Sequence, residues 1–217
     1  MTEHPLAPAD RTRANEIKRR VYAKEAPKYD READFVERRL FGTEHRGWAC
    51  SKATGDTLEV AIGTGLNLGH YPTDVRLIGL DLSPEMLALA ETRAKEMGRT
   101  IGLTEGDAQD LPFADGSFDT VVCTYALCSV PDDARAISEM HRVLKPGGRL
   151  ILVDHIRSSV LPILWVQWLY EFIPRRTKGE YATRRPSVHV TAADFNVQAR
   201  DRLRAGIIER LVAVKSG

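Results

Sequence analysis

Residues 58–65 read Leu-Glu-Val-Ala-Ile-Gly-Thr-Gly, an apolar run that ends in a glycine-containing turn. A short apolar run bounded by turn residues is typical of a buried strand. Glycines at its end let the backbone turn sharply and approach a ligand closely. Because ligands of open parallel sheets bind beyond the carboxyl ends of the strands, this segment predicts a first strand over residues 57–62 and a ligand-binding turn after it.

Four further strand-like runs follow, at residues 75–80, 101–103, 118–124 and 150–153. Ser83-Pro84 marks the start of a helix that extends to about Met97, because serine caps helices and proline suits their first position. A second helix is predicted over 132–144. Strands that alternate with helices predict an α/β fold, a Rossmann-like doubly wound sheet of five parallel strands.

The two ends of the chain differ from this central pattern. Residues 1–50 are polar and helical in pattern, with a predicted break at Ala26-Pro27, because the residue before proline disfavours α geometry. Separate helices are therefore expected over 11–24 and 30–40. Near the C-terminus, runs at 195–203 and 207–214 predict an antiparallel hairpin at the sheet edge.

We expect one domain over residues 1–217, with N-terminal lid helices (1–50), a cofactor-binding core (55–155) and an acceptor-side helix and hairpin (156–217).

The 31 basic and 30 acidic residues argue against broad nucleic-acid binding, which needs surplus positive charge. Three cysteines imply no disulfide framework. Residues 1–10 lack the apolar run of a signal peptide and residues 160–170 are too short to span a bilayer, so a cytoplasmic protein is expected.

The acid in the first motif separates two classes of cofactor. A dinucleotide fingerprint would place glycine where this chain has Leu68. Glu59 would lie near a pyrophosphate, which a carboxylate repels, whereas it attracts the cationic amino group of a methionine moiety. The motif therefore disfavours a nicotinamide oxidoreductase, which remains the alternative enzyme class.

Two further acids follow the next two predicted strands. Asp81 is placed to bind the ribose hydroxyls of an adenosine, although it could instead cap a helix. Asp107 can accept a hydrogen bond from an adenine amino group, although a polar turn would also explain it. Since the carboxyl ends of parallel strands share one edge, these acids are expected to lie together.

Taken in order, these motifs resemble those of class I S-adenosylmethionine (SAM)-dependent methyltransferases, from about Tyr22 to the C-terminus. Further matching segments are GSFD at 116–119, PDD at 131–133 and RVLKPGG at 142–148. Within this superfamily the chain is similar to ubiquinone/menaquinone C-methyltransferases, phospholipid N-methyltransferases and alkyl-thiol S-methyltransferases. Residues 63–67 and 123–130 resemble the thiol enzymes, whereas Ala61 replaces the family's usual first glycine.

The resemblance implies SAM as cofactor, S-adenosylhomocysteine as product and no metal. Residues expected to bind the cofactor lie at or just after the strand ends: Glu59, Ala61, Gly63, Thr64, Gly65, Asn67, Asp81, Leu82, Met86, Gly106, Asp107, Ala108, Thr124 and Tyr125. A SAM-binding protein without catalysis would keep the same residues.

Acceptor-side residues are less strongly indicated, because methyl transfer from a sulfonium needs little acid–base help. His155 is the first candidate for a base or orienting group, with a solvated histidine as the alternative. Tyr22 and Tyr29 lie in a segment that closes over the cofactor in similar enzymes, with helix packing as the alternative. Cys123 and Cys128 are interpreted as small core residues.

The acceptor is expected to be a small, largely apolar molecule methylated on sulfur or oxygen. Residues 160–172, which include Trp165 and Trp168, could line its pocket, form core or form a dimer face. The basic loop with Arg175, Arg176 and Lys178 is either solvated or contacts an anionic acceptor or lipid headgroups. C-methylation of a quinone-type ring and N-methylation of a phospholipid remain alternatives; the oligomeric state is undetermined.

Overall fold

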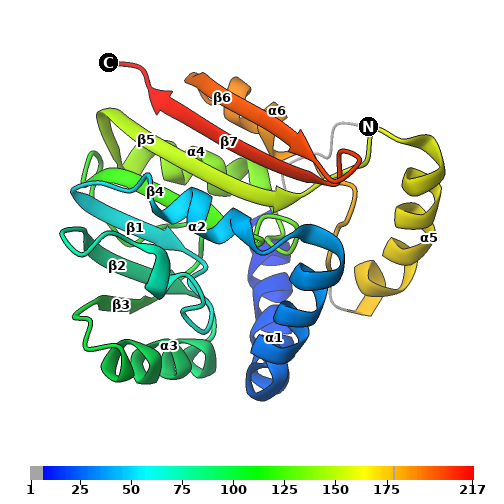
Figure 1. Ribbon diagram of the computed structural model, residues 1–217, viewed down its shortest axis with the longest axis horizontal. Helices are drawn as coiled ribbons and strands as arrows, with labels where there is room; N and C mark the ends of the chain where they lie inside the picture. Colours follow the sequence, from blue (N-terminus) through cyan, green and yellow to red (C-terminus); the bar gives the residue numbers. More distant parts are fainter. Residues whose placement is uncertain (1–6, 178) are drawn as a thin grey trace.

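One sheet of seven strands runs through the computed structural model, which describes residues 7–177 and 179–217 (Figure 1). Its spatial order is β3-β2-β1-β4-β5-β7-β6. The strands are β1 (Asp56–Val60), β2 (Arg76–Asp81), β3 (Gly102–Glu105), β4 (Phe118–Thr124), β5 (Leu144–His155), β6 (Phe195–Leu203) and β7 (Ile208–Lys215). The helices are α1 (Pro8–Val36), α2 (Glu44–Cys50), α3 (Pro84–Glu96), α4 (Asp133–Val143), α5 (Leu161–Thr177) and α6 (Pro186–Ala192), with a π-helical turn η1 (Glu37–Phe41) and a 3-10 turn η2 (Leu68–His70).

Strands β1 to β5 pair in parallel, and the β6–β7 hairpin adds to β5 in antiparallel fashion. The central strands are buried on both faces: Val121 packs into one apolar cluster and its neighbour Val122 into the other. This is why the sequence shows continuous apolar runs rather than alternation. The predicted doubly wound sheet with a C-terminal hairpin is confirmed.

Helix starts follow the capping signals. The Ser83 hydroxyl accepts a hydrogen bond from the Met86 amide at the start of α3, and the Asp132 carboxylate caps α4 through the Arg135 amide at 2.9 Å. Both caps direct the chain from the carboxyl end of a strand into the covering helix.

The N-terminal segment departs from the prediction. Instead of breaking at Ala26-Pro27, α1 continues for 29 residues, and the chain then passes directly into η1. The side chain of Pro27 is exposed while Ala26 is buried, so the missing amide lies on the outer side of a helix held by contacts with α3. Tertiary packing therefore outweighs the local preference against α geometry before proline.

The segment after β5 also differs from the prediction. Helix α5 extends through Thr177 into the expected loop 175–186, and α6 was not predicted. Lys178 lies outside the described residues, as do the side chains of Arg175 and Arg176. Of the three alternatives for residues 160–172, core is excluded within this chain, since the side chains of Trp165 and Trp168 are exposed. Among the described residues, no helix is long and apolar enough to cross a membrane.

Replacing Pro27 by alanine should slow amide hydrogen exchange in α1, because the substitution restores a helix hydrogen bond without removing buried contacts. Proline inside a helix costs about 3 kcal/mol relative to alanine. Pro84→Ala is the matched control, since Pro84 occupies the first turn of α3, where proline is tolerated. Mass-spectrometric exchange that is unchanged in α1 of the Pro27 variant would contradict this account of the helix.

Candidate functional site

A cavity lies at the carboxyl edge of the sheet, between the strand ends and α1. Many of the residues predicted to bind the cofactor or to catalyse line it: Tyr22, Tyr29, Ala61, Gly63, Asp81, Leu82, Met86, Gly106, Asp107, Ala108, Thr124 and Tyr125. Outside its lining are Glu59, Thr64, Gly65, Asn67 and His155. The edge of the sheet therefore brings together residues from four separate strand ends.

Asp81 ties two of these strand ends together. Its Oδ2 accepts a hydrogen bond from the Gly63 amide at 2.8 Å, and its Oδ1 accepts one from the Ser83 amide at 2.9 Å. Burial raises the pKa of this carboxyl, while the backbone donors at Ser83 and Gly63 act against that rise. The carboxylate faces the cavity with acceptor capacity left for hydroxyl groups.

Asp107 is held by a residue that the sequence did not single out. Its Oδ2 accepts a hydrogen bond from the Asn15 side chain of α1 at 2.6 Å, and its Oδ1 accepts one from the Gln109 amide at 2.9 Å. Asn15 itself lines the cavity. A polar side chain on the expected lid helix was the only sequence signal for this contact.

Beneath the glycine turn, Glu59 belongs to a buried polar network. Its Oε1 accepts a hydrogen bond from the Asn67 side-chain amide at 2.7 Å, and the same amide donates to the Thr124 hydroxyl at 2.9 Å. Among the described residues, Glu59 Oε2 has no hydrogen-bond partner. Burial raises the pKa of this carboxyl to about 7.

Arg46 extends this network to the N-terminal segment. Its guanidinium donates to the Asn67 and Thr124 side chains and forms a paired interaction with the Glu37 carboxylate of η1, 2.6 Å from Nη2 to Oε1. The Arg46 guanidinium also lies over the Tyr125 ring, 5.1 Å from its centroid. Sequence reasoning missed Arg46, because its partners lie up to 78 positions away.

Two residues of the cavity lining have a left-handed backbone. Ala61 has φ = 59° and Tyr125 has φ = 54°, a region that disfavours residues with a Cβ atom. Such conformations cost of order 1–3 kcal/mol and tend to cluster at functional sites. At Ala61, glycine would adopt this conformation at a lower cost because it has no Cβ atom.

Helix α1 covers the cavity through several contacts. The Thr64 hydroxyl donates to Asp30 at 2.5 Å, Arg93 of α3 pairs with the same carboxylate, and Arg19 pairs with Glu105 at 2.9 Å. The hydroxyl of Thr64, a predicted cofactor contact, therefore bonds to α1 in this structure.

The two tyrosines of α1 present their phenols to the cavity. Tyr22 and Tyr29 both line it. Burial raises the pKa of both phenols, that of Tyr29 to about 12, so both stay protonated at neutral pH. Protonated phenols keep their O–H groups as hydrogen-bond donors.

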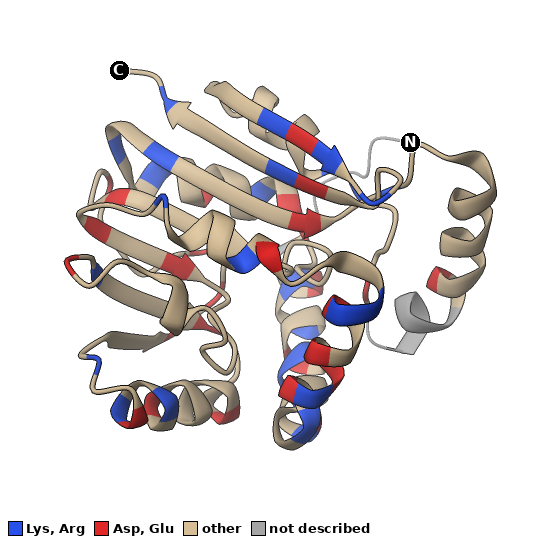
Figure 2. Ribbon diagram, in the orientation of Figure 1, with Lys and Arg blue, Asp and Glu red and all other residues tan. Residues whose placement is uncertain are grey.

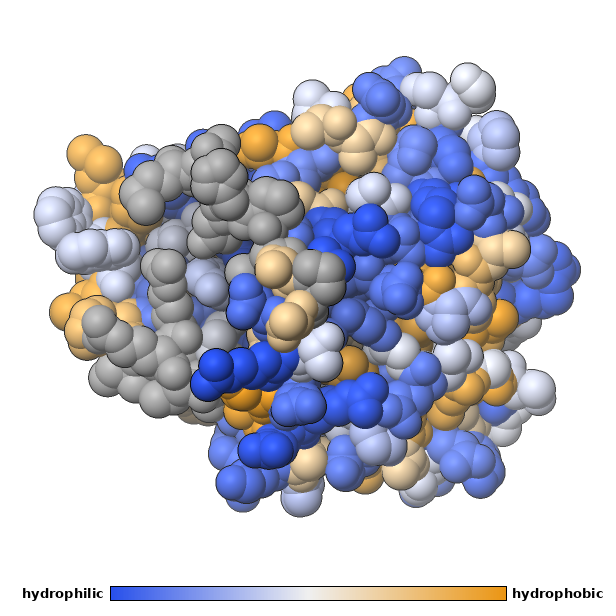
Figure 3. Space-filling model, turned by 180° about the vertical axis from the view of Figure 1, so that it is seen from behind, coloured by the Kyte–Doolittle hydropathy of each residue, from blue (hydrophilic) through white to orange (hydrophobic). Residues whose placement is uncertain are grey.

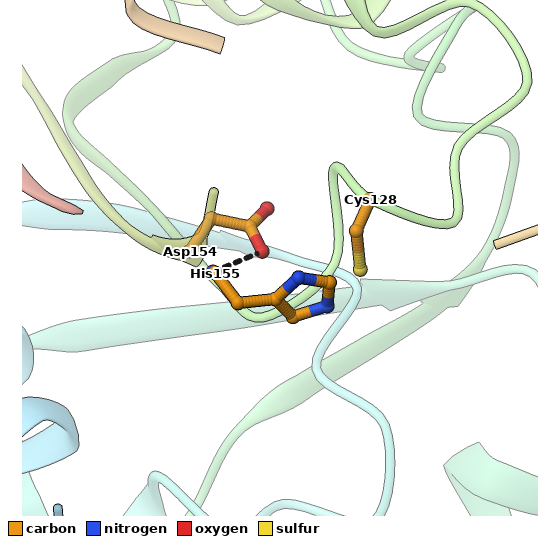
Figure 4. Close-up of side chains that lie close together, drawn as sticks. All are labelled: Cys128, Asp154 and His155. Carbon is orange, nitrogen blue, oxygen red and sulfur yellow. Dashed lines mark hydrogen bonds between the residues drawn. The ribbon is translucent and has the colours of Figure 1, made fainter. Parts of the chain in front are cut away.

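His155 lies at the end of β5, beside the cavity rather than in its lining. Figure 4 shows its imidazole next to the Cys128 thiol and the Asp154 carboxylate, with ligand atoms of the three residues within 4.8 Å of one another. The ring stacks on Phe41 of η1, which stacks on Tyr125, each at 5.6 Å between centroids. The stacked rings of Phe41 and Tyr125 therefore form an aromatic layer that links His155 to the cavity lining.

Cys123 and Cys128 are buried, as expected for small core residues. Burial raises the pKa of both thiols well above the usual value. Neither is therefore a ready nucleophile.

Lys18 is a buried cation in the cavity lining that the sequence did not reveal. Its ammonium group donates to the Gly179 carbonyl at 3.1 Å, and its side chain is almost wholly buried. Burial lowers the pKa of this lysine from 10.5 to about 8. On the helical pattern alone, Lys18 looks like one more charged residue of a solvated face.

Lys18→Met should stabilise the protein at pH 7, because the charged ammonium is disfavoured by burial. The free-energy cost of burying the charged ammonium is full below pH 8 and disappears as the pH rises to 10.5. The stability gained by Lys18→Met should therefore shrink over that range. The pKa difference corresponds to at most about 3 kcal/mol, reduced by loss of the hydrogen bond to Gly179. Urea unfolding of the parent and the variant from pH 7 to 10 measures this difference in stability.

The exposed Lys28, paired with Glu32 at 2.8 Å, provides the matched control. Lys28→Met should change stability by less than about 0.5 kcal/mol at every pH. A Lys18 variant that is less stable than the parent at pH 7 would show that the buried charge is fully compensated.

Comparison with known proteins gives a consistent family assignment. Residues 58–152 match the family model described as "Methyltransferase domain". The 2-phytyl-1,4-beta-naphthoquinone methyltransferase of Arabidopsis thaliana is 30% identical over 247 aligned positions, which cover 98% of this chain and 94% of that protein. The phosphatidylethanolamine N-methyltransferase of Cereibacter sphaeroides is 41% identical over 115 residues, 52% of this chain and 57% of the relative.

A human thiol S-methyltransferase is 35% identical over 135 residues, 60% of this chain and 54% of the relative. The chain thus spans little more than half the length of several curated relatives it matches. Among solved structures, a SAM-dependent methyltransferase from Methanosarcina mazei matches with a TM-score of 0.62 and 27% identity, covering 74% of this chain and 92% of that one. The match along nearly the whole chain, together with the cavity at the sheet edge, shows that this chain belongs to the SAM-dependent methyltransferases.

Proposed function

We propose that this enzyme methylates a small, largely apolar acceptor on sulfur or oxygen. The observation that carries the proposal is the chain from the end of β4 onward. Residues 123–130 of it resemble the thiol enzymes, and it supplies a wall of the cavity: Thr124, Tyr125, Ala126, Ser129, Val130 and Pro131. The wall combines apolar side chains with the hydroxyl groups of Thr124, Tyr125 and Ser129, a mixture that small-molecule sites share. The similarity to a human thiol S-methyltransferase supports the same acceptor chemistry.

The residues of the sheet edge fit the adenosine part of SAM. Asp81 would accept hydrogen bonds from the ribose hydroxyls, and Asp107 with Ala108 would face the adenine edge, while Leu82 and Met86 supply apolar cover. Glu59, beneath the glycine turn, would favour the cationic amino group through its charge rather than by direct contact. When bound, SAM supplies a methyl group on a sulfonium, which needs no further activation.

Asp81→Ala should weaken SAM binding about ten- to hundredfold, because hydrogen bonds to a charged acceptor contribute roughly 1.5–3 kcal/mol. Asp107→Ala should cost less, since one adenine contact is lost. Asp56→Ala, at the opposite end of β1, is the control and should leave affinity unchanged. Calorimetry with SAM and with NAD measures the difference; equal affinities in all variants, or binding of NAD alone, would refute the assignment.

Helix α1 would act by excluding water and by positioning the acceptor. Tyr22 and Tyr29 offer O–H donors to the cavity, and Lys18 adds a cation to its lining. His155 would position the acceptor wall through Phe41 and Tyr125, or act as base if the acceptor reaches past that layer.

Two substitutions of His155 separate these roles. His155→Ala should lower kcat about tenfold or more and leave SAM affinity unchanged. A general base typically contributes about 10²–10⁴-fold, and an acidic thiol acceptor would need less of this help. His155→Phe keeps a ring against Phe41 but removes the titratable nitrogen. Recovery of turnover in the Phe variant indicates positioning, loss in both indicates a base, and full activity in both excludes His155.

C-methylation of a quinone-type ring is the second candidate, favoured by the relative that aligns along 98% of this chain. N-methylation of a phospholipid is a further alternative, suggested by the bacterial relative. Turnover of SAM against thiols, phenols, quinols and amines, followed by mass spectrometry of the product, distinguishes them. A new carbon–methyl bond would overturn the heteroatom assignment.

A further inference from the structure

Helix α5 carries the main concentration of exposed apolar side chains in the described chain. Trp165, Trp168 and Leu169 are 68%, 66% and 75% exposed, and Leu161, Val166 and Tyr170 are similarly open. Figure 2 draws most of this helix without charge, whereas α1 alternates between basic and acidic residues. Seen from behind in Figure 3, apolar atoms project at the left edge, the side on which α5 lies.

The polarity of α5 is reversed relative to that of an ordinary surface helix. Gln167 points toward the protein, where its side chain accepts a hydrogen bond from the Ser158 amide at 2.7 Å and donates to the Ile156 carbonyl at 2.9 Å. The buried Glu171 accepts a hydrogen bond from the Thr183 hydroxyl at 2.7 Å. Since polar side chains hold the inner face, the outer face needs an apolar environment.

Two exposed arginines border this apolar face. Arg157 lines a groove together with Leu161, Trp165 and Trp168. Arg185 follows Arg184 in the chain, and the Arg184 carbonyl accepts a hydrogen bond from the Arg157 amide at 3.3 Å, so the two exposed arginines lie near each other. Neither Arg157 nor Arg185 forms an ion pair within the described residues, so the groove is apolar with positive charge at its margin.

We propose that α5 docks on the surface of an anionic lipid bilayer, with its apolar face in the interface and Arg157 and Arg185 toward lipid phosphates. Tryptophan and tyrosine favour this boundary, because their rings have an apolar body and a polar tip. The inner hydrogen bonds of Gln167 and Glu171 leave only one face free, so the helix lies along the surface.

A second copy of this chain fits the face less well. A two-fold contact through α5 would gather Arg157 and Arg185 of both copies in one interface, and this concentration of like charge is unfavourable. An anionic headgroup layer instead complements them, at about 1 kcal/mol of attraction for each basic residue near the surface.

The docking helix is linked directly to the cavity. The chain that follows α5 runs along the cavity wall, where the Gly179 carbonyl accepts the hydrogen bond from Lys18 and the Tyr181 amide donates to the Cys128 carbonyl at 2.8 Å. A docked α5 therefore places the site beside the lipid surface. The proposal does not depend on which acceptor atom is methylated.

Tryptophan fluorescence provides a direct test, since two of the three tryptophans lie in α5. Trp48→Phe removes the third, which lies in α2. Vesicles of phosphatidylcholine with 30% phosphatidylglycerol should shift the emission of this variant to shorter wavelength, and brominated lipid chains should quench it. Pure phosphatidylcholine vesicles should bind more weakly, and salt should reduce binding. No shift and no quenching would overturn the proposal.

Paired variants locate the contact. Trp165→Ser with Leu169→Ser should lower the vesicle partition coefficient at least tenfold in a flotation assay, and Arg157→Gln about fivefold. Leu89→Ser with Met97→Ser, which alters exposed apolar residues on and just after α3, is the control and should have no effect. Equal losses in both pairs would overturn the proposal, as would a parent dimer that becomes monomeric in the α5 variant without any vesicle binding.

Discussion

The hydrogen bonds that Asp81 accepts from the Gly63 and Ser83 amides set the geometry on which the site depends. They fix the turn after β1 against the end of β2, so that backbone amides and a carboxylate face one cavity. Keeping an acid buried there is unfavourable, and the burial raises its pKa. The protein tolerates this because backbone donors orient the carboxylate before any ligand arrives, which is the basis of preorganised binding.

A second buried network transmits that geometry to the N-terminal segment. Glu59, Asn67 and Thr124 belong to the sheet edge and its turns, whereas Arg46 and Glu37 belong to α2 and η1. The Phe41–Tyr125 stack reinforces the same junction. Because these residues hydrogen-bond to one another, α2 and η1 cannot shift without disturbing the sheet edge that carries Glu59, Asn67 and Thr124.

The sheet was predictable because strand burial and helix caps are local signals. Apolar runs, Ser83-Pro84 and the acids after successive strands located the sheet, one helix start and two carboxylates of the cavity lining, whereas the family resemblance supplied most of the other lining residues. The other features of the site depend on contacts between positions far apart in the sequence. The Lys18 ammonium donates to the Gly179 carbonyl, and Arg46 contacts Thr124, which lies 78 positions away. Pro27 shows the converse, a correct local preference overruled by packing of α1.

The contacts that hold α1 over the cavity have a consequence for the kinetics of closure. Arg19 and Glu105 pair at 2.9 Å with side chains about half exposed, and Arg93 with Asp30 is also partly open to water. Charges in such positions are screened by dissolved ions, with a Debye length near 8 Å at physiological ionic strength. The ion pairs of α1 are thus sensitive to the salt around the protein, whereas the buried network beneath it is shielded from dissolved ions. If α1 acts as the lid, higher ionic strength would weaken its hold on the cavity edge and leave the buried network beneath it unaffected.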